Sequence, residues 1–367
     1  MNKDNKKRLI FMLPTLTGGG AERVASLLSI YMPYNIDLKF ILFEDKISYK
    51  YKGEIFVLNL PGHRSLLIKF WNMFLRYIRV KRYLRMFKPD AVLSFMEGPN
   101  LLNILTNKKP YISVRNYKSL SEKKNLINKS IIKFLYNRAY KIIVNSEGIK
   151  RDLIKRWKIN SKKIKVIYNP VDITNIQRLK KEKIDVNFKE IFKYPVIINV
   201  GSLTEQKGQK YLLRAFAEVK KDMKDVKLLI LGEGPLRKEL ELLAEKLGIK
   251  KDVIMPGFVK NPFKYISRSK LFVLSSLWEG FPMVLLEAIA CGVPVISSNC
   301  KSGPAEILDN DFLFPPKDIN TMSTLILKFL KLDKDYLYNK LEKLQKTLER
   351  ELNPLSIAKR YLEVLAK

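Results

Sequence analysis

Two glutamates stand in an otherwise apolar segment, residues 278–288, which reads WEGFPMVLLEA. Glu279 and Glu287 are separated by seven residues. The continuous apolar run Leu271–Leu274 predicts a strand that leads into the loop bearing Glu279. A helix is predicted to begin near Pro282, because proline is favoured in the first turn of a helix. The pattern therefore places one carboxylate before a helix and the other inside it.

The start of this predicted helix is suited to binding an anion. The backbone N–H groups of Met283 and Val284 would have no partner inside the helix, and they lie at the positive end of its dipole. Glu287, about one turn further on, could accept two hydrogen bonds from a ribose diol, as acidic residues do in dinucleotide-binding folds. An ordinary helical glutamate is the alternative, and the apolar neighbours of Glu287 weaken it.

A lysine stands in a second loop that is predicted to follow a strand. The apolar run 196–200 ends at residues 201–208, GSLTEQKG, which carry Lys207. An ammonium group at the end of a strand can point at a diphosphate. A solvated lysine in a lysine-rich chain is the alternative, and the sequence leaves both interpretations open.

A run of glycines follows the first predicted strand. Gly18, Gly19 and Gly20 precede Ala21–Arg23, which opens the first predicted helix. Glycines let a backbone approach a phosphate closely, and the start of a helix offers free N–H groups. The run matches neither G-x-G-x-x-G nor a P-loop, so a plain strand-to-helix turn is the alternative to phosphate binding.

Short apolar runs alternate with helical periodicity along the chain, and these elements must position the loops. The predicted strands are residues 9–13, 38–43, 55–58, 91–95, 111–114, 141–144, 196–200, 227–231, 253–255, 271–274 and 294–297. The predicted helices include residues 21–32, 209–219, 236–247 and 283–291, and a helical tail from residue 319 with a break at Pro354. Most of the strands are continuously apolar, which is typical of parallel strands covered on both faces. An α/β fold with doubly wound sheets is predicted.

Two Rossmann-like domains of similar size, facing a central cleft, follow from this pattern. We expect a first domain at residues 1–180, a second domain at residues 181–350, and a C-terminal helix at 351–367 that packs back on the first domain. The hinge is expected around residues 168–172, YNPVD, because Asn-Pro favours a turn. In open α/β sheets, ligands bind outside the carboxyl ends of the strands.

The charge of the chain is extreme and uneven. Sixty-nine Lys and Arg residues oppose 36 Asp and Glu residues, for a formal net charge of +33. Residues 1–170 hold 35 basic and 11 acidic side chains, a net charge of +24, and the remainder holds 34 and 25, a net charge of +9. Such a field attracts nucleic acid, an anionic membrane surface or a phosphorylated substrate. No recognisable nucleic-acid-binding module accompanies it, so we expect no nucleic-acid partner.

Cysteine usage and hydropathy indicate the compartment. Cys291 and Cys300 are the two cysteines, which excludes a disulfide framework and suits a reducing environment. The apolar run that follows the charged start stops at Pro14, too short for a signal-peptide core of ~7–15 residues. No apolar run approaches the ~18–20 residues of a membrane span. We expect a cytoplasmic protein, peripheral on the inner face of the cytoplasmic membrane.

Residues 64–88 read RSLLIKFWNMFLRYIRVKRYLRMFK and predict an amphipathic basic helix. An apolar stripe recurs at helical spacing through Leu67, Phe70, Trp71, Phe74 and Ile78. Lys69, Arg76 and Arg79 lie off that face, and Arg82 and Arg85 fall back near it. Aromatic residues flanked by cations are typical of a helix at a membrane interface. Packing of the stripe on the domain's own sheet is the alternative.

The spacing of Glu279 and Glu287 resembles the E-x7-E signature of retaining glycosyltransferases with the GT-B fold, specifically family 4. The resemblance covers most of the chain. It includes the segments GGGAERV, YNPVD, VGSLTEQKGQKYLLRAF, LGEGPLRKELE, PGFV at 256–259, and ACGVPV followed by SGPAEIL. The order and spacing of these segments together are specific to the family.

The resemblance implies a site for a nucleotide sugar. Lys207 would contact the donor diphosphate, Glu279 would lie near the donor sugar and its phosphates, and Glu287 would hold the ribose. Lys207 and Glu279 are therefore catalytic candidates, together with Arg115. The further donor-binding candidates are Gly19 and Gly20, closing over the phosphates; Ser202; Phe258 and Val259, lining the base pocket; and the backbone of Phe281, Pro282, Met283 and Val284.

The chain departs from the family pattern at two points. Ser202 stands where the family usually has arginine, so one cation on the leaving diphosphate is missing, and Arg115 or Arg23 would compensate. Many members carry a histidine near the reacting sugar, whereas His63 here lies in a predicted loop and is interpreted as a surface residue. Two weaker acceptor-side candidates follow predicted strands: Glu97 and Asn116.

The implied activity is transfer of a hexose or N-acetylhexosamine, expected from a UDP-sugar, to a lipid-linked or polysaccharide acceptor, as in lipopolysaccharide or capsule biosynthesis. No metal-binding D-x-D pair stands at a predicted strand end, so no metal and no cofactor are expected, and cations and helix-end amides would stabilise the leaving diphosphate. A GT-B sugar-nucleotide epimerase or phosphorylase stays open as an alternative, as does, less favoured, a non-enzymatic polyanion-binding protein.

Overall fold

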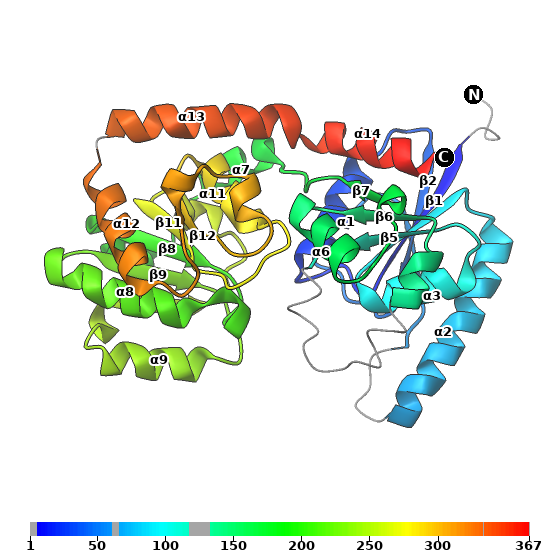
Figure 1. The fold of residues 1–367 in the computed structure, drawn as a ribbon, viewed down its shortest axis with the longest axis horizontal. Coiled ribbons are helices and arrows are strands. Elements are labelled where there is room, and N and C mark those ends of the chain that lie inside the picture. The colour runs from blue at the N-terminus through cyan, green and yellow to red at the C-terminus, as the bar shows by residue number, and fades with distance from the viewer. Residues whose placement is uncertain (1–5, 61–65, 117–132, 333, 367) are drawn as a thin grey trace. The chain divides into compact units, whose positions relative to one another are not determined.

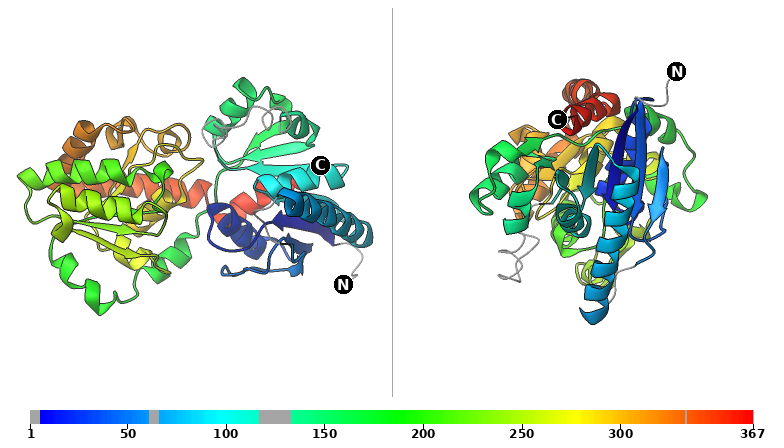
Figure 2. Two further views of the ribbon diagram at one scale, coloured as in Figure 1. Left: turned by 90° about the horizontal axis from the view of Figure 1, so that it is seen from below. Right: turned by 90° about the vertical axis from the view of Figure 1, so that its right-hand side faces the viewer.

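The computed structural model describes residues 6–60, 66–116, 133–332 and 334–366. The chain divides into two compact units, residues 1–170 with 354–367, and residues 171–353. Each unit contains one parallel β-sheet with helices packed on it (Figures 1 and 2). The predicted α/β class with two doubly wound sheets is confirmed.

The described part of the first unit contains a sheet of seven strands in the order β3-β2-β1-β4-β5-β6-β7, and every pair is parallel. Strands β4 and β5 are buried along their length, and β1 is buried over its last five residues, because both faces of the sheet are covered. The strand bounds are β1 Lys7–Leu13, β2 Ile36–Leu42, β3 Glu54–Val57, β4 Ala91–Phe95, β5 Pro110–Val114, β6 Lys141–Val144 and β7 Ile164–Val166.

The helices of the first unit connect these strands and cover the sheet. Helix α1 packs against α14, and α2 packs against α3. A core of Ile10, Ile41, Val92 and Leu102 lies beneath α2. The bounds are α1 Gly20–Tyr31, α2 Leu66–Phe87, α3 Glu97–Thr106, α6 Glu147–Lys155, the 3₁₀ helix η2 Ser161–Lys163, and α14 Pro354–Leu365.

The second unit repeats the same topology. Its described strands follow the order β10-β9-β8-β11-β12-β13, again with every pair parallel. The strand bounds are β8 Val196–Val200, β9 Lys227–Leu231, β10 Val253–Gly257, β11 Leu271–Leu274, β12 Val295–Ser298 and β13 Leu313–Phe314.

Two groups of helices cover the second sheet. Helix α8 contacts α9 and α12, while α11 contacts α7, α10 and α13. Figure 1 shows α7 and α11 above the strands and α8 and α9 below them. The α-helix bounds are α7 Ile173–Leu179, α8 Gln209–Asp222, α9 Arg237–Lys246, α10 Phe263–Ile266, α11 Met283–Cys291, α12 Ile319–Lys331 and α13 Lys334–Glu351. The 3₁₀ helices are η3 Val186–Phe188, η4 Glu190–Lys193, η5 Glu205–Lys207, η6 Lys250–Asp252, η7 Pro304–Glu306 and η8 Asn310–Phe312.

The chain passes between the units at residue 170, earlier than the predicted boundary at 180. The reason is α7, which packs on α11 and so belongs to the second unit. At Pro354 the chain passes back, and the predicted break of the helical tail lies here, because α13 ends at Glu351 and Pro354 begins α14. In the described part of the chain, no helix is long and apolar enough to cross a membrane.

Candidate functional site

The two central strands of the second sheet, β8 and β11, lie side by side where the strand order reverses. From β8 the chain proceeds to β9 and β10 on one side, and from β11 to β12 and β13 on the other. The loops that leave β8 and β11 therefore diverge at the carboxyl edge of the sheet. A reversal of this kind is where open α/β sheets bind their ligands.

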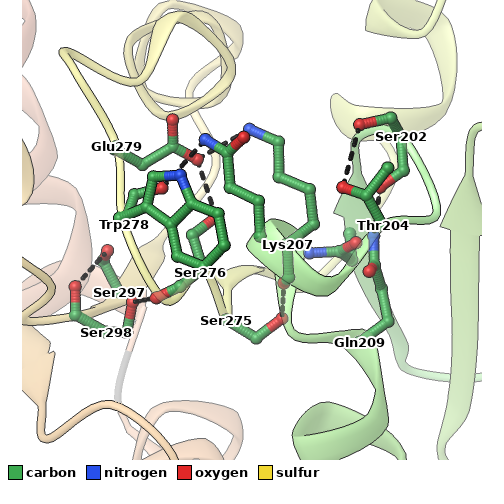
Figure 3. Close-up of polar contacts among 12 residues, drawn as sticks. Ser202, Thr204, Lys207, Gln209, Ser275, Ser276, Trp278, Glu279, Ser297 and Ser298 are labelled. Atoms are coloured by element: carbon green, nitrogen blue, oxygen red, sulfur yellow. Dashed lines mark hydrogen bonds and ion pairs between the residues drawn. The ribbon is translucent and has the colours of Figure 1, made fainter. Parts of the chain in front are cut away.

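These two loops bring Lys207 and Glu279 together. The Lys207 Nζ lies 2.6 Å from the Glu279 Oε1, and the side chains are only 18% and 8% exposed. Ser276 Oγ donates a second hydrogen bond, of 2.7 Å, to the same oxygen. Figure 3 shows the ammonium, the hydroxyl and the carboxylate converging. The geometry unites two residues that the sequence predicts separately, and each charge compensates the burial of the other.

A side chain of each loop donates a hydrogen bond to the backbone of the other loop. Gln206 Nε2 donates to the carbonyl of Trp278 at 2.9 Å, and Ser275 Oγ donates to the carbonyl of Lys207 at 2.8 Å. Gly208 has a φ of +64°, and a Cβ there would lie 2.3 Å from the Ser275 carbonyl oxygen. Only glycine fits this close approach. The loops thus hold the ion pair in place.

The loop that carries Glu279 leads directly into α11. Pro282 is the N-cap of α11, and no side chain caps the helix by a hydrogen bond. Phe281 and Pro282 are buried, while Met283 and Val284 are half-buried. The first N–H groups of α11 consequently present the positive end of its dipole at the carboxyl edge of the sheet.

Glu287 lies further along α11 and is 2% exposed. Its neighbours along the helix, Leu285 and Leu286, are fully buried as well. Burial, and then the charge of Glu287, raise the pKa of the Cys291 thiol to about 12. A carboxylate accepts hydrogen bonds through both of its oxygens, so it can bind the hydroxyl groups of a ligand.

The segment SGPAEIL packs on this loop, although the sequence assigned no residue of this segment to the site. Ser302 Oγ donates to the Gly280 carbonyl at 2.9 Å. Gly303 has a φ of +96°, and a Cβ there would lie 2.6 Å from Pro282 Cδ. Both residues therefore fix the backbone that precedes α11. The turn-forming Ser-Gly-Pro sequence was the available signal.

Three other donor-side candidates, Ser202, Phe258 and Val259, also lie on the second unit. Ser202 is exposed, with its Oγ 3.5 Å from Thr204 Oγ1. Phe258, just after β10, is 77% exposed, and Val259 is half-buried. An exposed aromatic ring beside a strand end offers a surface on which a base can stack.

In the first unit the glycine run follows β1, which lies beside β4 where that sheet reverses. Gly19 is the N-cap of α1 and Gly20 its first residue. A Cβ on Gly19 would lie 2.1 Å from Glu22 Oε2, whereas a Cβ on Gly20 would meet nothing within 4 Å. The carboxylate of Glu22, which is 6% exposed, therefore lies against the turn. Burial raises the pKa of Glu22, and the charge of Arg115 partly opposes that rise.

Arg115 bridges three parts of the first unit. Its guanidinium donates to Ser113 Oγ at 3.3 Å, to the Tyr361 hydroxyl of α14 at 3.2 Å, and to Asn169 Oδ1 next to the unit boundary. It also lies over the ring of Phe95, 5.9 Å from the centroid. These contacts give Arg115 a structural task, and its catalytic role stays a prediction.

The acceptor-side candidates are placed differently from one another. Glu97 follows β4, as predicted, and is the first residue of α3, after Met96 with a φ of +72°. Asn116 follows β5 and is exposed. His63 lies outside the described residues. Among the described residues, no group of three or more His, Cys, Asp and Glu side chains could hold a metal ion.

The arrangement in the second unit is suited to binding an anionic ligand. An ammonium held at the carboxyl edge of the sheet and the start of α11 both supply positive potential. Such groups are fixed before a reaction begins, so they can stabilise the charge that develops on a departing phosphate without reorganising. The chemistry favoured here is therefore the departure of a phosphorylated leaving group.

Comparison with known proteins agrees with this interpretation. Residues 180–347 match the family of glycosyl transferases group 1, and residues 18–175 match glycosyltransferase family 4. A diphospho-undecaprenol 4-α-N-acetylgalactosaminyltransferase from Campylobacter jejuni is 33% identical over 83% of this chain and 84% of its own. The lipopolysaccharide 1,6-galactosyltransferase of Escherichia coli is 28% identical over 68% of each chain.

The solved structure of Anabaena HepE in complex with UDP and glucose superposes with a TM-score of 0.81 at 19% identity. It covers 98% of this chain and 99% of that one, which confirms the predicted GT-B fold. The two family models together span most of the chain, from residue 18 to residue 347, and the Campylobacter relative matches more than four-fifths of it. The chain therefore belongs to the group 1, family 4 glycosyltransferases and is a hexosyltransferase of that family.

Proposed function

We propose that the protein transfers a hexose or N-acetylhexosamine from a UDP-sugar to a lipid-linked or polysaccharide acceptor, with retention of anomeric configuration, at the inner face of the cytoplasmic membrane. The observation that carries the proposal is the buried pair of Lys207 and Glu279 at the reversal point of the second sheet. The Campylobacter relative is named for a diphospho-undecaprenol acceptor, and HepE was solved with UDP and glucose, which supports these substrate classes.

In the proposed donor complex, the Lys207 ammonium and the first N–H groups of α11 contact the diphosphate. Glu287 accepts hydrogen bonds from the ribose diol, and Phe258 and Val259 line the base pocket. Ser202 leaves Lys207 as the cation of the segment 201–208. Lys207 therefore carries more of the electrostatic stabilisation than in relatives with an arginine there. Gly19 and Gly20 supply backbone contacts to the phosphates.

The reaction breaks the bond between the anomeric carbon and the β-phosphate oxygen. Its electron pair leaves with UDP, and an acceptor hydroxyl forms the new glycosidic bond while its proton passes to the departing phosphate. Glu279 lies close to the reacting sugar and stabilises the positive charge of the oxocarbenium-like transition state. Its hydrogen bonds from Lys207 and Ser276 hold the carboxylate in one orientation for that purpose.

Nucleotide binding tests the donor half of the proposal. Thermal unfolding is measured with UDP, GDP, ADP and 2′-deoxy-UDP at matched concentrations. A ligand at ~100 times its dissociation constant adds ~2.7 kcal/mol to stability, so UDP should raise the midpoint visibly. Glu287→Ala should remove the preference for UDP over 2′-deoxy-UDP, because the ribose contact is lost. A shift with GDP alone, or with no nucleotide, would contradict the proposed donor.

Sugar transfer tests the acceptor half. Each UDP-hexose and UDP-N-acetylhexosamine is offered with a short-chain polyprenyl-diphosphate saccharide, and UDP release and product are measured. UDP release that requires the acceptor supports a transferase, whereas conversion of the donor without acceptor would indicate an epimerase. The anomeric configuration of the product, measured by NMR, decides between retention and inversion.

A further inference from the structure

Helix α2 presents two apolar faces, and only one of them packs on the domain. The sequence left open whether the stripe through Trp71, Phe74 and Ile78 covers the sheet or a membrane. In the structure a different face packs against the core. Its members are Met73, Tyr77, Val80, Tyr83, Leu84 and Phe87. The core is therefore covered without the predicted stripe, of which Leu67 and Phe70 lie outside the described side chains.

The second apolar face is exposed. Trp71 is 61% exposed, Phe74 53% and Ile78 45%. The rings of Trp71 and Phe74 are neighbours, with centroids 6.0 Å apart. Figures 1 and 2 show the beginning of α2 extending past the strands. Large apolar side chains gathered in this way on a surface are typical of an interaction site rather than of ordinary surface composition.

Two cations continue the same face. Positions 71, 74, 78, 82 and 85 recur every three or four residues and so lie on one side of the helix, over about 21 Å. Arg82 and Arg85 occupy the last two positions, and both are exposed. Arg76 and Arg79 instead donate to the carbonyls of Leu60 and Leu58 and help to fix α2 on its own domain. One side of α2 is thus apolar where the helix begins and cationic where it ends.

The charge of the surroundings selects the partner. The segment 66–87 contains six basic residues and no acidic residue, and residues 1–170 carry a net charge of +24. A second copy of this chain would bring two such fields together, which is unfavourable. An anionic lipid surface complements the charge, and Trp is favoured at the boundary between headgroups and acyl chains.

We propose that α2 lies along the surface of an anionic membrane. Trp71, Phe74 and Ile78 enter the interfacial region, and Arg82 and Arg85 contact lipid phosphates. The inference rests on the proposed function, because it names the surface by which the enzyme reaches its lipid-linked acceptor. The alignment of all five residues on one side requires the helix axis to lie roughly parallel to the membrane.

Vesicle binding tests the proposal. Flotation of the full-length protein is measured with vesicles of phosphatidylcholine alone and with one-third phosphatidylglycerol, at low and high salt. The wild type should bind the anionic vesicles and dissociate as salt increases. The triple variant Trp71→Ser, Phe74→Ser, Ile78→Ser should bind about a hundredfold more weakly, and Arg82→Glu with Arg85→Glu at least about tenfold more weakly.

Matched controls lie on α9 of the second unit. Leu242 is 66% exposed there, so Leu242→Ser removes an equally accessible apolar side chain. Lys238→Glu with Lys246→Glu changes the total charge by the same amount as the arginine variant, at exposed positions. Both controls should bind vesicles nearly as the wild type does. If the lysine control weakened vesicle binding as much as the arginine variant does, the placement of the membrane contact on α2 would be wrong.

Tryptophan fluorescence gives a second readout. Of the three tryptophans, Trp157 is 4% exposed and Trp278 is half-buried in the donor site, whereas Trp71 is 61% exposed. Anionic vesicles should shift the emission of the wild type to shorter wavelength, and lipids brominated in their acyl chains should quench it. Trp71→Phe should keep vesicle binding and lose the shift. A shift that persists in Trp71→Phe would show that Trp71 does not enter the membrane.

Two further measurements distinguish membrane docking from a loss of transfer activity and from self-association. Transfer to the short-chain acceptor in solution should be unchanged in the triple variant, so a failure of membrane docking is distinguishable from a failure of the proposed activity. Sedimentation of the free protein reports on self-association. If the triple variant abolished a dimer and left vesicle binding intact, α2 would be an interface between copies, and the proposal would be wrong.

Discussion

The Lys207 ammonium has two partners in the proposed reaction, the carboxylate of Glu279 and the donor diphosphate. The carboxylate lies 2.6 Å from the ammonium, and a bound diphosphate would share that ammonium. Loss of one partner leaves the other charged and buried, which costs about 3–5 kcal/mol in comparable pairs. Stability and catalysis therefore depend on the same two side chains in different ways.

Substitution of Lys207 and Glu279 separates their contribution to stability from their contribution to catalysis. Lys207→Met should lower kcat/KM by roughly 10²–10³-fold, because a preorganised cation on the leaving group is lost, and it should also lower the free energy of unfolding. Lys207→Met combined with Glu279→Gln should recover much of the stability and none of the activity. Urea unfolding and steady-state transfer assays measure the two effects.

A control comes from a second ion pair of the same unit. Lys227 Nζ lies 2.5 Å from Asp252 Oδ1, with exposures of 21% and 18%, and is not part of the site. Lys227→Met should reduce stability and leave kcat/KM within about twofold. Equal activity of wild type and Lys207→Met would remove Lys207 from the proposed mechanism.

Glu22 provides a prediction that depends on pH. Burial raises its pKa above the ordinary value of 4.5, so the folded state holds the proton more tightly than the unfolded state does. This contribution to stability is complete below pH 4.5 and is lost as the pH rises through the folded-state pKa. Glu22→Gln is neutral at every pH and should therefore raise the unfolding midpoint at pH 7, with the gain vanishing near pH 4.

Glu349, exposed on α13, is the control for Glu22, because Glu349→Gln should have no comparable pH-dependent effect. Calorimetry of the three proteins between pH 4 and pH 8 makes the comparison. A destabilised Glu22→Gln at pH 7 would mean that the attraction to Arg115 outweighs the burial of the carboxylate. The buried carboxylate of Glu22 lowers stability at neutral pH, and such a cost is expected where the charge next to the glycine turn serves function.

At the scale of elements, the sequence predicts long apolar strands well. Continuous runs bounded by polar residues gave β4, β6, β8, β9, β11 and the helix α11 with the bounds that the structure has. Strands β7 and β13 were missed because they contain only three and two residues, too few to show a period. For α2, periodicity identified the helix but not its packed face, since aromatic residues occur on both sides.

The candidate site, like the fold, was predicted only in part from the sequence. Lys207 and Glu279 were each predicted from the loop that bears them, but their pairing across 72 positions depends on β8 lying beside β11. Strand order is a tertiary property, so no local pattern contains it. For the same reason the bonds from Gln206 and Ser302 to the loop that follows β11 were not predicted.

The short connection between η5 and α8 depends on a glycine, and this gives a prediction at the scale of elements. Gly208→Ala must strain a φ of +64° and also displace the Ser275 carbonyl, which would lie 2.3 Å from the new Cβ. Gly248 has a φ of +70° and open space around it. Gly248→Ala should therefore cost only about 1–2 kcal/mol of backbone strain.

Gly208→Ala should lose clearly more stability than Gly248→Ala, and transfer activity should fall with it because the loop bearing Lys207 moves. Chemical unfolding and kcat/KM of both variants provide the comparison. Equal stability losses in the two variants would show that the close approach of the β8 and β11 loops does not constrain residue 208.

At the scale of the whole molecule, the chain links its units twice. It leaves the first unit at residue 170 and returns at Pro354, and the returning helix α14 packs on α1. Ile357, Ala358 and Tyr361 of α14 are fully buried. Through Tyr361 and Asn169, Arg115 bonds both segments at which the chain passes between units. The first unit therefore depends on residues that follow the whole second unit along the chain.

Truncation after Asn353 tests this dependence. It removes Ile357, Tyr361 and Leu365 from the first unit, and burial of such side chains contributes about 1.5–3 kcal/mol each. At roughly 2–4 °C per kcal/mol for a unit of this size, the unfolding midpoint of the first unit should fall by about 10 °C or more, while that of the second unit stays unchanged. Calorimetry should resolve two transitions, and UDP should shift only the upper, unaffected one. Leu355→Ser, at a 47% exposed position of α14, is the control and should leave both transitions in place. A parallel fall of both transitions after truncation would show that the units unfold together and that α14 stabilises the chain as a whole.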